Sequence, residues 1–491
     1  MPLELSGERR IDLGSDHGDR ESHKTSSLNE KETYEEEERP LKYKIIALLC
    51  VLSLALGSHY AGHALDALKA VIKTELGISN SQYGVVQSSV TLVNTILPIL
   101  GGVFIDIFGT LVGSVLATSL IAIGNILVAL STDLKSFAVM VIGRILYGLG
   151  SGPIVIVQVA ILSNWFRGKG LAIAVGIQIA VSRLSSFLAN LTVIPIAKVT
   201  GSYKWAFWFT AFLCFFSLII NLIYVLLMRK FHKRLNTQEM LKLKQKKHFN
   251  PKILLIFPII YWFFVLLEFI LGSVWASFLT IHTELVKIRW NKTDETAAYD
   301  ASIAQFLPIF ISPFLGFLLD RFGHRSLVLI VSAVFLVISM GLLGFTSAIT
   351  PIIGMICFSI SLSFGPVTTL STIPVLLPMD YVGTGLGFIK STSNVGSTIY
   401  NILVGLLQDL DKGMYGKVMI FYLTSSILAI IASLCLYFVS KKWYDNILDM
   451  KESERKVYYK EKNEKDRLGE NRITLLFAVH IRYTVYISSI Q

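Results

Sequence analysis

Apolar runs of about 20 residues recur about twelve times between residues 44 and 440, and this feature constrains the fold more than any other. A helix needs about 20 apolar residues to cross the hydrocarbon core of a bilayer. The pattern therefore predicts an all-α membrane protein with about twelve transmembrane helices. The predicted spans lie at residues 44–65, 83–106, 110–131, 136–164, 170–197, 205–228, 252–280, 300–320, 326–347, 351–377, 384–408 and 418–440.

The composition agrees with this class and excludes others. Of the 491 residues, 53% are hydrophobic and 16% are charged, whereas an ordinary soluble domain is about 25% charged. A soluble enzyme or a disordered scaffold is therefore excluded. The chain has no Ser/His/Asp set, H-E-x-x-H motif or phosphate-binding loop, so we expect neither catalysis nor a cofactor. The cysteines lack metal-ligand spacing, so we interpret them as packing residues and expect no metal site.

The positive charge is concentrated in one loop. The formal net charge is +11, and many of the cations lie between Arg229 and Lys252. The positive-inside rule makes this loop cytoplasmic, and an even number of spans then places both ends of the chain in the cytosol. Binding of anionic lipid or nucleic acid is the alternative for the loop. We expect contact with membrane lipid and no nucleic acid partner.

These features divide the chain into five segments. We predict a disordered cytosolic N-tail at 1–42, an N-terminal six-helix bundle at 43–228, a basic cytosolic linker at 229–250, a C-terminal six-helix bundle at 251–440 and a cytosolic C-tail at 441–491. The loop between spans 7 and 8 then lies on the lumenal side, and it carries a glycosylation sequon that begins at Asn291. Segment 472–491 has no functional interpretation.

A motif occurs once in each predicted bundle. Both copies read G-x-x-x-D-x-x-G; one contains Gly102, Asp106 and Gly109, and the other contains Gly316, Asp320 and Gly323. A second echo relates Gly176 in span 5 to Gly387 in span 11 at nearly the same offset. Two echoes at similar offsets indicate a duplicated six-helix unit, which is how many transporters are built.

The second copy continues through Arg321 and Arg325 and resembles the signature loop, G-x-x-x-D-R-x-G-x-R, of the major facilitator superfamily. The first copy has Ile107 where the pattern has Arg. The run from Arg144 to Gly150 resembles the span-4 motif of the same superfamily. The resemblance covers residues 43–440 and implies two pseudo-symmetric six-helix bundles that expose a central site to each side in turn. It also implies a gating role for Arg144 and the signature-loop residues, with solvated, topology-setting charges as the alternative.

A narrower resemblance links the chain to the lysosomal dipeptide transporter branch of this superfamily. It rests on residues 164–169, 176–178, 182–184, 311–313 and 383–388. The branch exports dipeptides, often cationic ones, from the lysosome as a uniporter, together with a glycosylated lumenal accessory membrane protein. The resemblance implies such a substrate and partner and a lysosomal or vacuolar membrane location, and it leaves a homodimer open.

Arg183 is the sharpest candidate for function. It lies about thirteen residues into span 5, near mid-bilayer, where a charge costs at least about 2.5–3.5 kcal/mol. A guanidinium matches a carboxylate with two parallel hydrogen bonds, and the resemblance implies an arginine here that holds the carboxyl end of the peptide. An internal ion pair is the alternative. We expect other polar side chains to complete the site: Asn94, Gln158, Glu268, Asn394, Tyr60 and His63.

One position departs from the branch. Its members carry a carboxylate on span 4 that holds the amino end of the substrate, and this chain has Gly152 there. Glu268 in span 7 is a candidate replacement, with a packed protonated acid or a proton-binding group as alternatives. Asp66 near the lumenal end of span 1 is a weaker candidate. Two other functions therefore stay open: a proton-coupled carrier of organic anions or monocarboxylates on the same fold, and a non-transporting membrane receptor or scaffold.

Overall fold

The computed structural model describes residues 41–68, 72, 75–78, 80–166, 170–232, 257–412, 414–451, 453–455 and 457–458. Three predicted features lie wholly or largely outside them: the N-tail up to residue 40, the linker from residue 233 onward, and the C-tail from residue 459 onward, including segment 472–491.

The described chain is helical, and no strand occurs in these ranges. The prediction of an all-α membrane protein is confirmed, because eleven segments are long and apolar enough to cross a membrane. In chain order the helices are α2 (Leu41–Leu54), α3 (Leu56–Ala67), α5 (Asn80–Phe108), α6 (Thr110–Leu134), α7 (Phe137–Phe166), α8 (Leu171–Val199), α9 (Lys204–His232), α11 (Ile259–Leu267), η2 (Glu268–Gly272), α12 (Ser273–Trp290), α13 (Asp294–Phe306), α14 (Pro308–Phe322), α15 (Arg325–Phe345), α16 (Pro351–Leu376), η3 (Met379–Tyr381), α17 (Val382–Leu410) and α18 (Gly416–Trp443).

The twelfth predicted span is α17, which is 29 residues long but too polar to count among the eleven. A continuous polar stretch runs from Lys390 to Asn394 near its middle. The helix packs against α5 and η2, so this stretch is placed against protein. Polar residues in a membrane helix are tolerated where they face neighbouring helices or a water-filled space.

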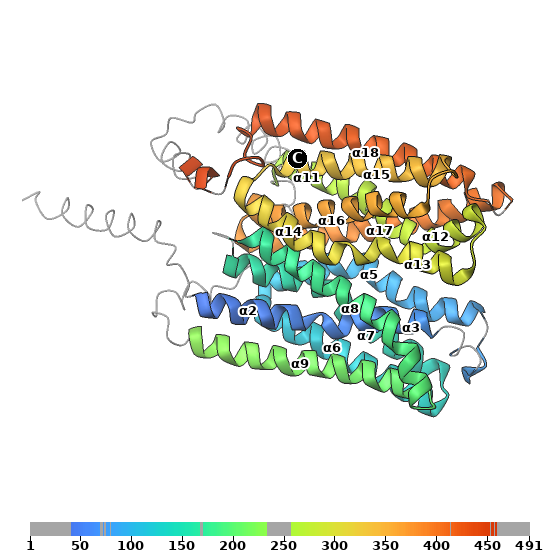
Figure 1. Ribbon diagram of the computed structural model, residues 1–491. Helices are drawn as coiled ribbons and strands as arrows, with labels where there is room; N and C mark the ends of the chain where they lie inside the picture. Colours follow the sequence, from blue (N-terminus) through green and yellow to red (C-terminus); the bar gives the residue numbers. More distant parts are fainter. Residues whose placement is uncertain are drawn as a thin grey trace, which may run out of the picture. The chain divides into compact units, whose positions relative to one another are not determined.

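From Ile46 onward the described chain forms one compact unit. Its helices from α3 to α9 lie together, and those from α11 to α18 lie together above them in the view of Figure 1. The two groups meet chiefly where α5 packs on α17 and where α8 packs on α14. These contacts pair spans 2 and 11 and spans 5 and 8, which is the symmetry expected of a duplicated six-helix unit.

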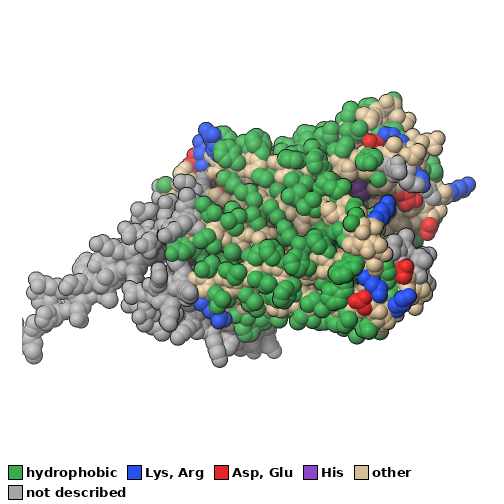
Figure 2. Space-filling model, turned by 60° about the horizontal axis from the view of Figure 1, so that its bottom comes forward, with side chains coloured by type: hydrophobic (Ala, Val, Ile, Leu, Met, Phe, Trp, Pro, Cys, Tyr) green, Lys and Arg blue, Asp and Glu red, His purple; other side chains and the backbone are tan. Residues whose placement is uncertain are grey.

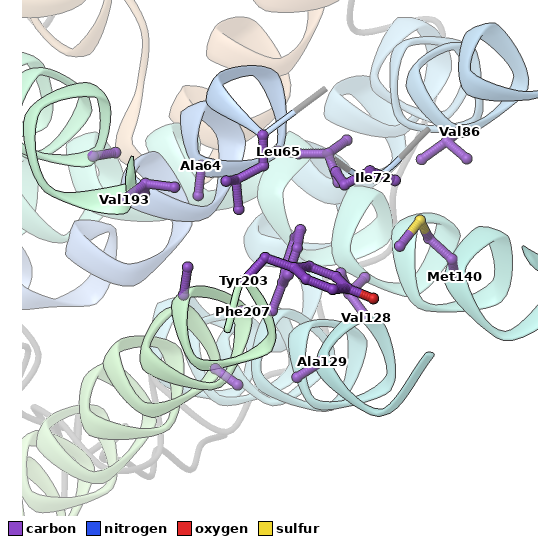
Figure 3. Close-up of a cluster of buried hydrophobic side chains, with 14 of the residues drawn as sticks. Ala64, Leu65, Ile72, Val86, Val128, Ala129, Met140, Val193, Tyr203 and Phe207 are labelled. Atoms are coloured by element: carbon purple, nitrogen blue, oxygen red, sulfur yellow. The ribbon is translucent and has the colours of Figure 1, made fainter. Parts of the chain in front are cut away.

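Both the interior and the outer surface are apolar. Leu65, Met140 and Phe207 belong to a buried cluster that joins α3, α7 and α9 (Figure 3). Figure 2 shows apolar side chains covering the middle of one face, with charged side chains toward its ends. Large apolar residues such as Phe310 and Phe314 are each 62% exposed. A surface of this kind is stable against lipid and not against water.

Candidate functional site

Asp106 joins the two helix groups at one end of the molecule. It lies in the last turn of α5, and its carboxylate accepts hydrogen bonds from the backbone N–H groups of Gly383 (2.9 Å) and Thr384 (2.6 Å) and from the Thr384 hydroxyl (2.6 Å). These backbone groups belong to the first turn of α17, where they have no partner within their own helix. A carboxylate is stabilised there by hydrogen bonds and by the helix dipole together.

Asp320 makes the equivalent contact between α14 and α8. Its carboxylate accepts from the backbone N–H groups of Ala172 (3.1 Å) and Ile173 (2.8 Å) in the first turn of α8. Arg325 and Arg455 add favourable electrostatic interactions with this carboxylate. Each aspartate of the duplicated motif thus caps a helix of the opposite group. We call the end of the molecule that contains both contacts the capped end.

Glycines let the two helix groups approach closely at the capped end. A Cβ atom at Gly102 would lie 2.1 Å from the Gly383 carbonyl oxygen, and one at Gly316 would lie 2.3 Å from the Ala172 carbonyl oxygen. Both distances are far below van der Waals contact, so only glycine fits. Gly176 and Gly387, which form the second sequence echo, approach the backbones of Ser312 and Pro98 in the same way. The two echoes therefore mark the two tight crossings between the helix groups.

The other signature residues shape the loops and the bundle interiors. Gly109 and Gly323 have φ values of 86° and 75°, a backbone conformation that suits glycine in a tight turn. Arg321 is exposed at the end of α14, whereas Arg325 is buried. Arg144 is also buried, with its guanidinium 4.9 Å from the centre of the Tyr147 ring.

A second group of charged residues lies deeper in the bundle. Glu268 begins η2, one turn of π-helix between α11 and α12, and such turns often occur at functional sites. Its carboxylate accepts a hydrogen bond from the Ser393 hydroxyl of α17. Gly272 makes room for this bond, because a Cβ atom there would lie 2.5 Å from Ser393 Oγ and 2.9 Å from Glu268 Oε1.

Lys390 lies one helical turn before Ser393 on the same face of α17. It interacts electrostatically with Glu268 and also with Arg183, which lies near the middle of α8. His59 of α3 interacts with Arg183, Lys390 and His63. We call these five residues the central cluster: His59, His63, Arg183, Glu268 and Lys390.

The central cluster is built by both helix groups. Its histidines and Arg183 come from α3 and α8, and Glu268 and Lys390 come from η2 and α17. All five residues are partly accessible rather than fully buried. The His59 Nε2 atom is buried and has no hydrogen-bond partner within the described residues. A charged side chain at this depth is unfavourable unless it is compensated or serves a function. The central cluster contains several charged side chains.

Two predicted lining residues are placed elsewhere. Tyr60 is 3% exposed, and its hydroxyl lies 2.7 Å from Thr192 Oγ1 between α3 and α8. Gln158 is 1% exposed; its amide donates to the Val51 carbonyl oxygen (2.8 Å) and accepts from Gln178 (2.9 Å). Both side chains are engaged within the N-terminal helix group. The sequence identifies them as polar residues within spans, but it does not say whether such a residue faces a site or a neighbouring helix.

The two predicted asparagines lie where the helix groups meet. The Asn394 amide donates to the Asn94 carbonyl oxygen and links α17 to α5. The Asn94 Oδ1 atom is buried without a hydrogen-bond partner among the described residues, and it lies 2.8 Å from where a Cβ atom of Gly152 would be. The Asn94 amide therefore occupies the space in which the resemblance places an acidic side chain. Asn291, the predicted glycosylation position, is exposed at the C-terminal end of α12.

Lys390 was not identified from the sequence. The signal was available, because Lys390 is a lone lysine inside the polar stripe that runs from Gly387 to Asn394 on a predicted span. A lysine in that position requires a compensating group. Glu268 is a sequence candidate because it could replace the missing span-4 carboxylate. A single sequence does not connect it to Lys390, because spans 7 and 11 are distant in sequence.

Comparison with solved structures places this helix arrangement among membrane transporters. The proton:xylose symporter XylE, bound to 6-bromo-6-deoxy-D-glucose, superposes with a TM-score of 0.66 at 15% identity, covering 82% of this chain and 96% of XylE. FucP in the outward conformation superposes with a TM-score of 0.64 at 14% identity, covering 80% and 99%. These likenesses establish the fold alone.

The sequence gives the family. The Major Facilitator Superfamily model matches residues 48–401, so the chain belongs to this superfamily of transporters and is not an enzyme. Among curated proteins it is similar to the lysosomal dipeptide transporter MFSD1 of Mus musculus, at 26% identity over 83% of this chain and 89% of the relative. The MFSD1 protein of Homo sapiens is 25% identical over 83% and 88%.

Proposed function

We propose that the protein carries dipeptides, or closely related small carboxylates, from a lysosomal or vacuolar lumen to the cytosol by alternating access. The observation that carries the proposal is the central cluster, which offers cations and an anion to one space from both helix groups. A zwitterionic dipeptide needs both kinds of partner. The similarity to proteins named lysosomal dipeptide transporters supports the substrate class and the membrane.

In this proposal Arg183 holds the substrate carboxylate and Glu268 holds its ammonium group. The Arg183 guanidinium offers two parallel N–H donors that fit a carboxylate. Glu268 already accepts a hydrogen bond from Ser393 and attracts the Lys390 cation. A substrate ammonium would replace Lys390 as the partner of this carboxylate. Because Arg183 and Glu268 belong to opposite helix groups, a bound dipeptide would connect the two groups.

The capped end is the cytosolic end in this account, which follows from the predicted positions of the basic linker and both tails. The bundles at 43–228 and 251–440 rock about the central cluster, and the caps at Asp106 and Asp320 open when the site turns to the cytosol. A uniporter requires similar substrate affinity in the two states, because a ligand shifts an equilibrium only by its differential affinity. A glycosylated accessory membrane protein, membrane lipid and a second copy of the chain are the partners we infer.

Uptake of labelled Ala-Ala into proteoliposomes that contain the full-length protein tests the proposal. We expect saturable uptake by the wild type. Arg183→Ala should abolish it, and Arg183→Lys should retain part of it because one donor cation remains. Unchanged uptake by Arg183→Ala would refute the role of Arg183, provided that the variant is folded in the same vesicles.

A proton-coupled carrier of organic anions is the second candidate, and one observation favours it: a carboxylate and two histidines lie within the same deep cluster. Uptake driven by an imposed pH gradient separates the two functions. Coupling predicts accumulation above equilibrium in the wild type and loss of accumulation in Glu268→Gln. Uniport predicts that uptake stops at equal concentrations.

A further inference from the structure

We propose that the central cluster selects dipeptides with an acidic side chain over those with a cationic one, and that Lys390 sets this preference. The inference rests on the proposed function, since it concerns which dipeptides the same site accepts. It runs opposite to the preference that the sequence resemblance implies.

The cluster has an unbalanced charge. Arg183 and Lys390 are cations, Glu268 is the one anion among the described side chains that interacts with them, and His59 and His63 add positive charge whenever they are protonated. With neutral histidines, the described side chains of this set therefore keep one uncompensated positive charge. An unpaired charge removed from bulk water is strongly unfavourable, so the empty site attracts an additional anionic group.

Among the described side chains of the N-terminal helix group, no carboxylate is shown to interact with Arg183 or Lys390; the side chain of Asp66 lies outside the described set. Asp106 is occupied in capping α17, and Asp133 pairs with Lys204 Nζ at 3.2 Å. Gly152 contributes no side chain, and the adjacent Asn94 amide is neutral. The substrate itself must then balance the cluster.

The charge of the substrate side chain decides how well this balance is met. The main-chain carboxylate and ammonium of a dipeptide cancel each other, so a dipeptide with neutral side chains leaves the excess positive charge in place. A glutamate side chain removes the excess, and a lysine side chain doubles it. At a separation of about 10 Å and an effective dielectric constant of about 20, one unit charge changes affinity by about tenfold.

Lys390 is the cation that sets the preference, because Arg183 is assigned to the main-chain carboxylate. When the substrate ammonium replaces Lys390 as the partner of Glu268, Lys390 is left to bind a second carboxylate. The position of Lys390 one turn from Ser393 on α17 holds it beside Glu268 in the absence of substrate.

Competition against labelled Ala-Ala uptake in proteoliposomes measures this preference. The competitors are Ala-Glu, Ala-Gln and Ala-Lys, which differ mainly in the charge of one side chain. For the wild type we expect the inhibition constant of Ala-Glu to be about tenfold below that of Ala-Gln, and that of Ala-Lys to be about tenfold above it. Lys390→Gln should make Ala-Glu and Ala-Gln nearly equal and improve Ala-Lys about tenfold. Lys390→Arg, the matched control, should keep the wild-type order.

The outcomes separate this inference from the proposed function. If the wild type transports Ala-Ala but binds Ala-Lys as well as Ala-Glu, the inference is overturned and the proposed function stands. If none of the four peptides is bound or transported, the proposed function fails and the inference fails with it. If a folded Lys390→Gln variant keeps the wild-type order, Lys390 is not the determinant. The wild-type order itself needs no variant, so a misfolded substitution does not remove the test.

Discussion

Replacing Asp106 with asparagine should open the capped end. The Asp106 carboxylate accepts three hydrogen bonds from Gly383 and Thr384 across the two helix groups. Asparagine keeps one acceptor oxygen, turns an N–H group toward the donors of α17 and removes the favourable interaction with the helix dipole. A hydrogen bond to a charged group contributes about 1.5–3 kcal/mol, and the dipole interaction about 0.3–1 kcal/mol.

We therefore expect the capped state to lose about 2–3 kcal/mol relative to the alternative, which is a change of about 30- to 150-fold in the ratio of the two states. The magnitude assumes that the alternative state makes no equivalent contact with Asp106. Water that solvates the exposed N–H groups of α17 recovers part of the loss, so we expect the lower end of this range.

Double electron–electron resonance, which measures the distance between two spin labels, measures this ratio directly. Spin labels at Phe108 and Met379, which are 57% and 36% exposed, lie at the capped end on opposite helix groups. In a background without the native cysteines, Asp106→Asn should add a longer-distance population. Asp411→Asn is the matched control, because Asp411 accepts from the Lys417 N–H at 3.1 Å and both residues belong to the C-terminal group. Asp411→Asn should give the same distances as the parent. If Asp106→Asn also gave those distances, the reasoning would be refuted.

Two further changes test the packing. Gly102→Ala places a methyl group 2.1 Å from the Gly383 carbonyl oxygen, so we expect about 1–3 kcal/mol of destabilisation and a lower melting temperature. Gly341→Ala is the control and should have little effect, because the space around its Cβ position is open. Equal melting temperatures of the two variants would contradict the close crossing. Asp449, 7% exposed, accepts from the Ser326 N–H at 2.9 Å, so Asp449→Asn should destabilise the protein by about 1–3 kcal/mol. Asp445→Asn, at an exposed position, should change the melting temperature much less, and the opposite ranking would exclude a structural role for Asp449.

The sequence predicted the features that depend on local pattern. Apolar runs of sufficient length predicted the helices, and the run at 384–408 predicted α17, although this helix is too polar to count among the eleven candidate spans. The duplicated motif predicted that Asp106 and Asp320 hold equivalent positions in the two bundles. Their partners, the first turns of α17 and α8, follow from the same symmetry.

Contacts between segments that are distant in sequence could not be predicted from local pattern. The π-helical turn at Glu268 has no local signature, because it depends on packing against Ser393 and Gly396 of α17. Tyr60 and Gln158 were predicted to line the site, but their side chains bond to neighbouring helices of the N-terminal group. The partnership of Lys390 with Glu268 needed the fold, since a single sequence does not show that η2 and α17 are adjacent.

The central claim is that Arg183 binds a substrate carboxylate within a cluster that both helix groups build. Equilibrium binding of Ala-Ala and of its C-terminal carboxamide to the purified full-length protein tests it most directly. The carboxamide keeps the size and the ammonium group but offers no carboxylate to the guanidinium. We predict that it binds at least about 30-fold more weakly, which corresponds to about 2 kcal/mol of charge-assisted hydrogen bonding. Equal binding of the two peptides would contradict the account.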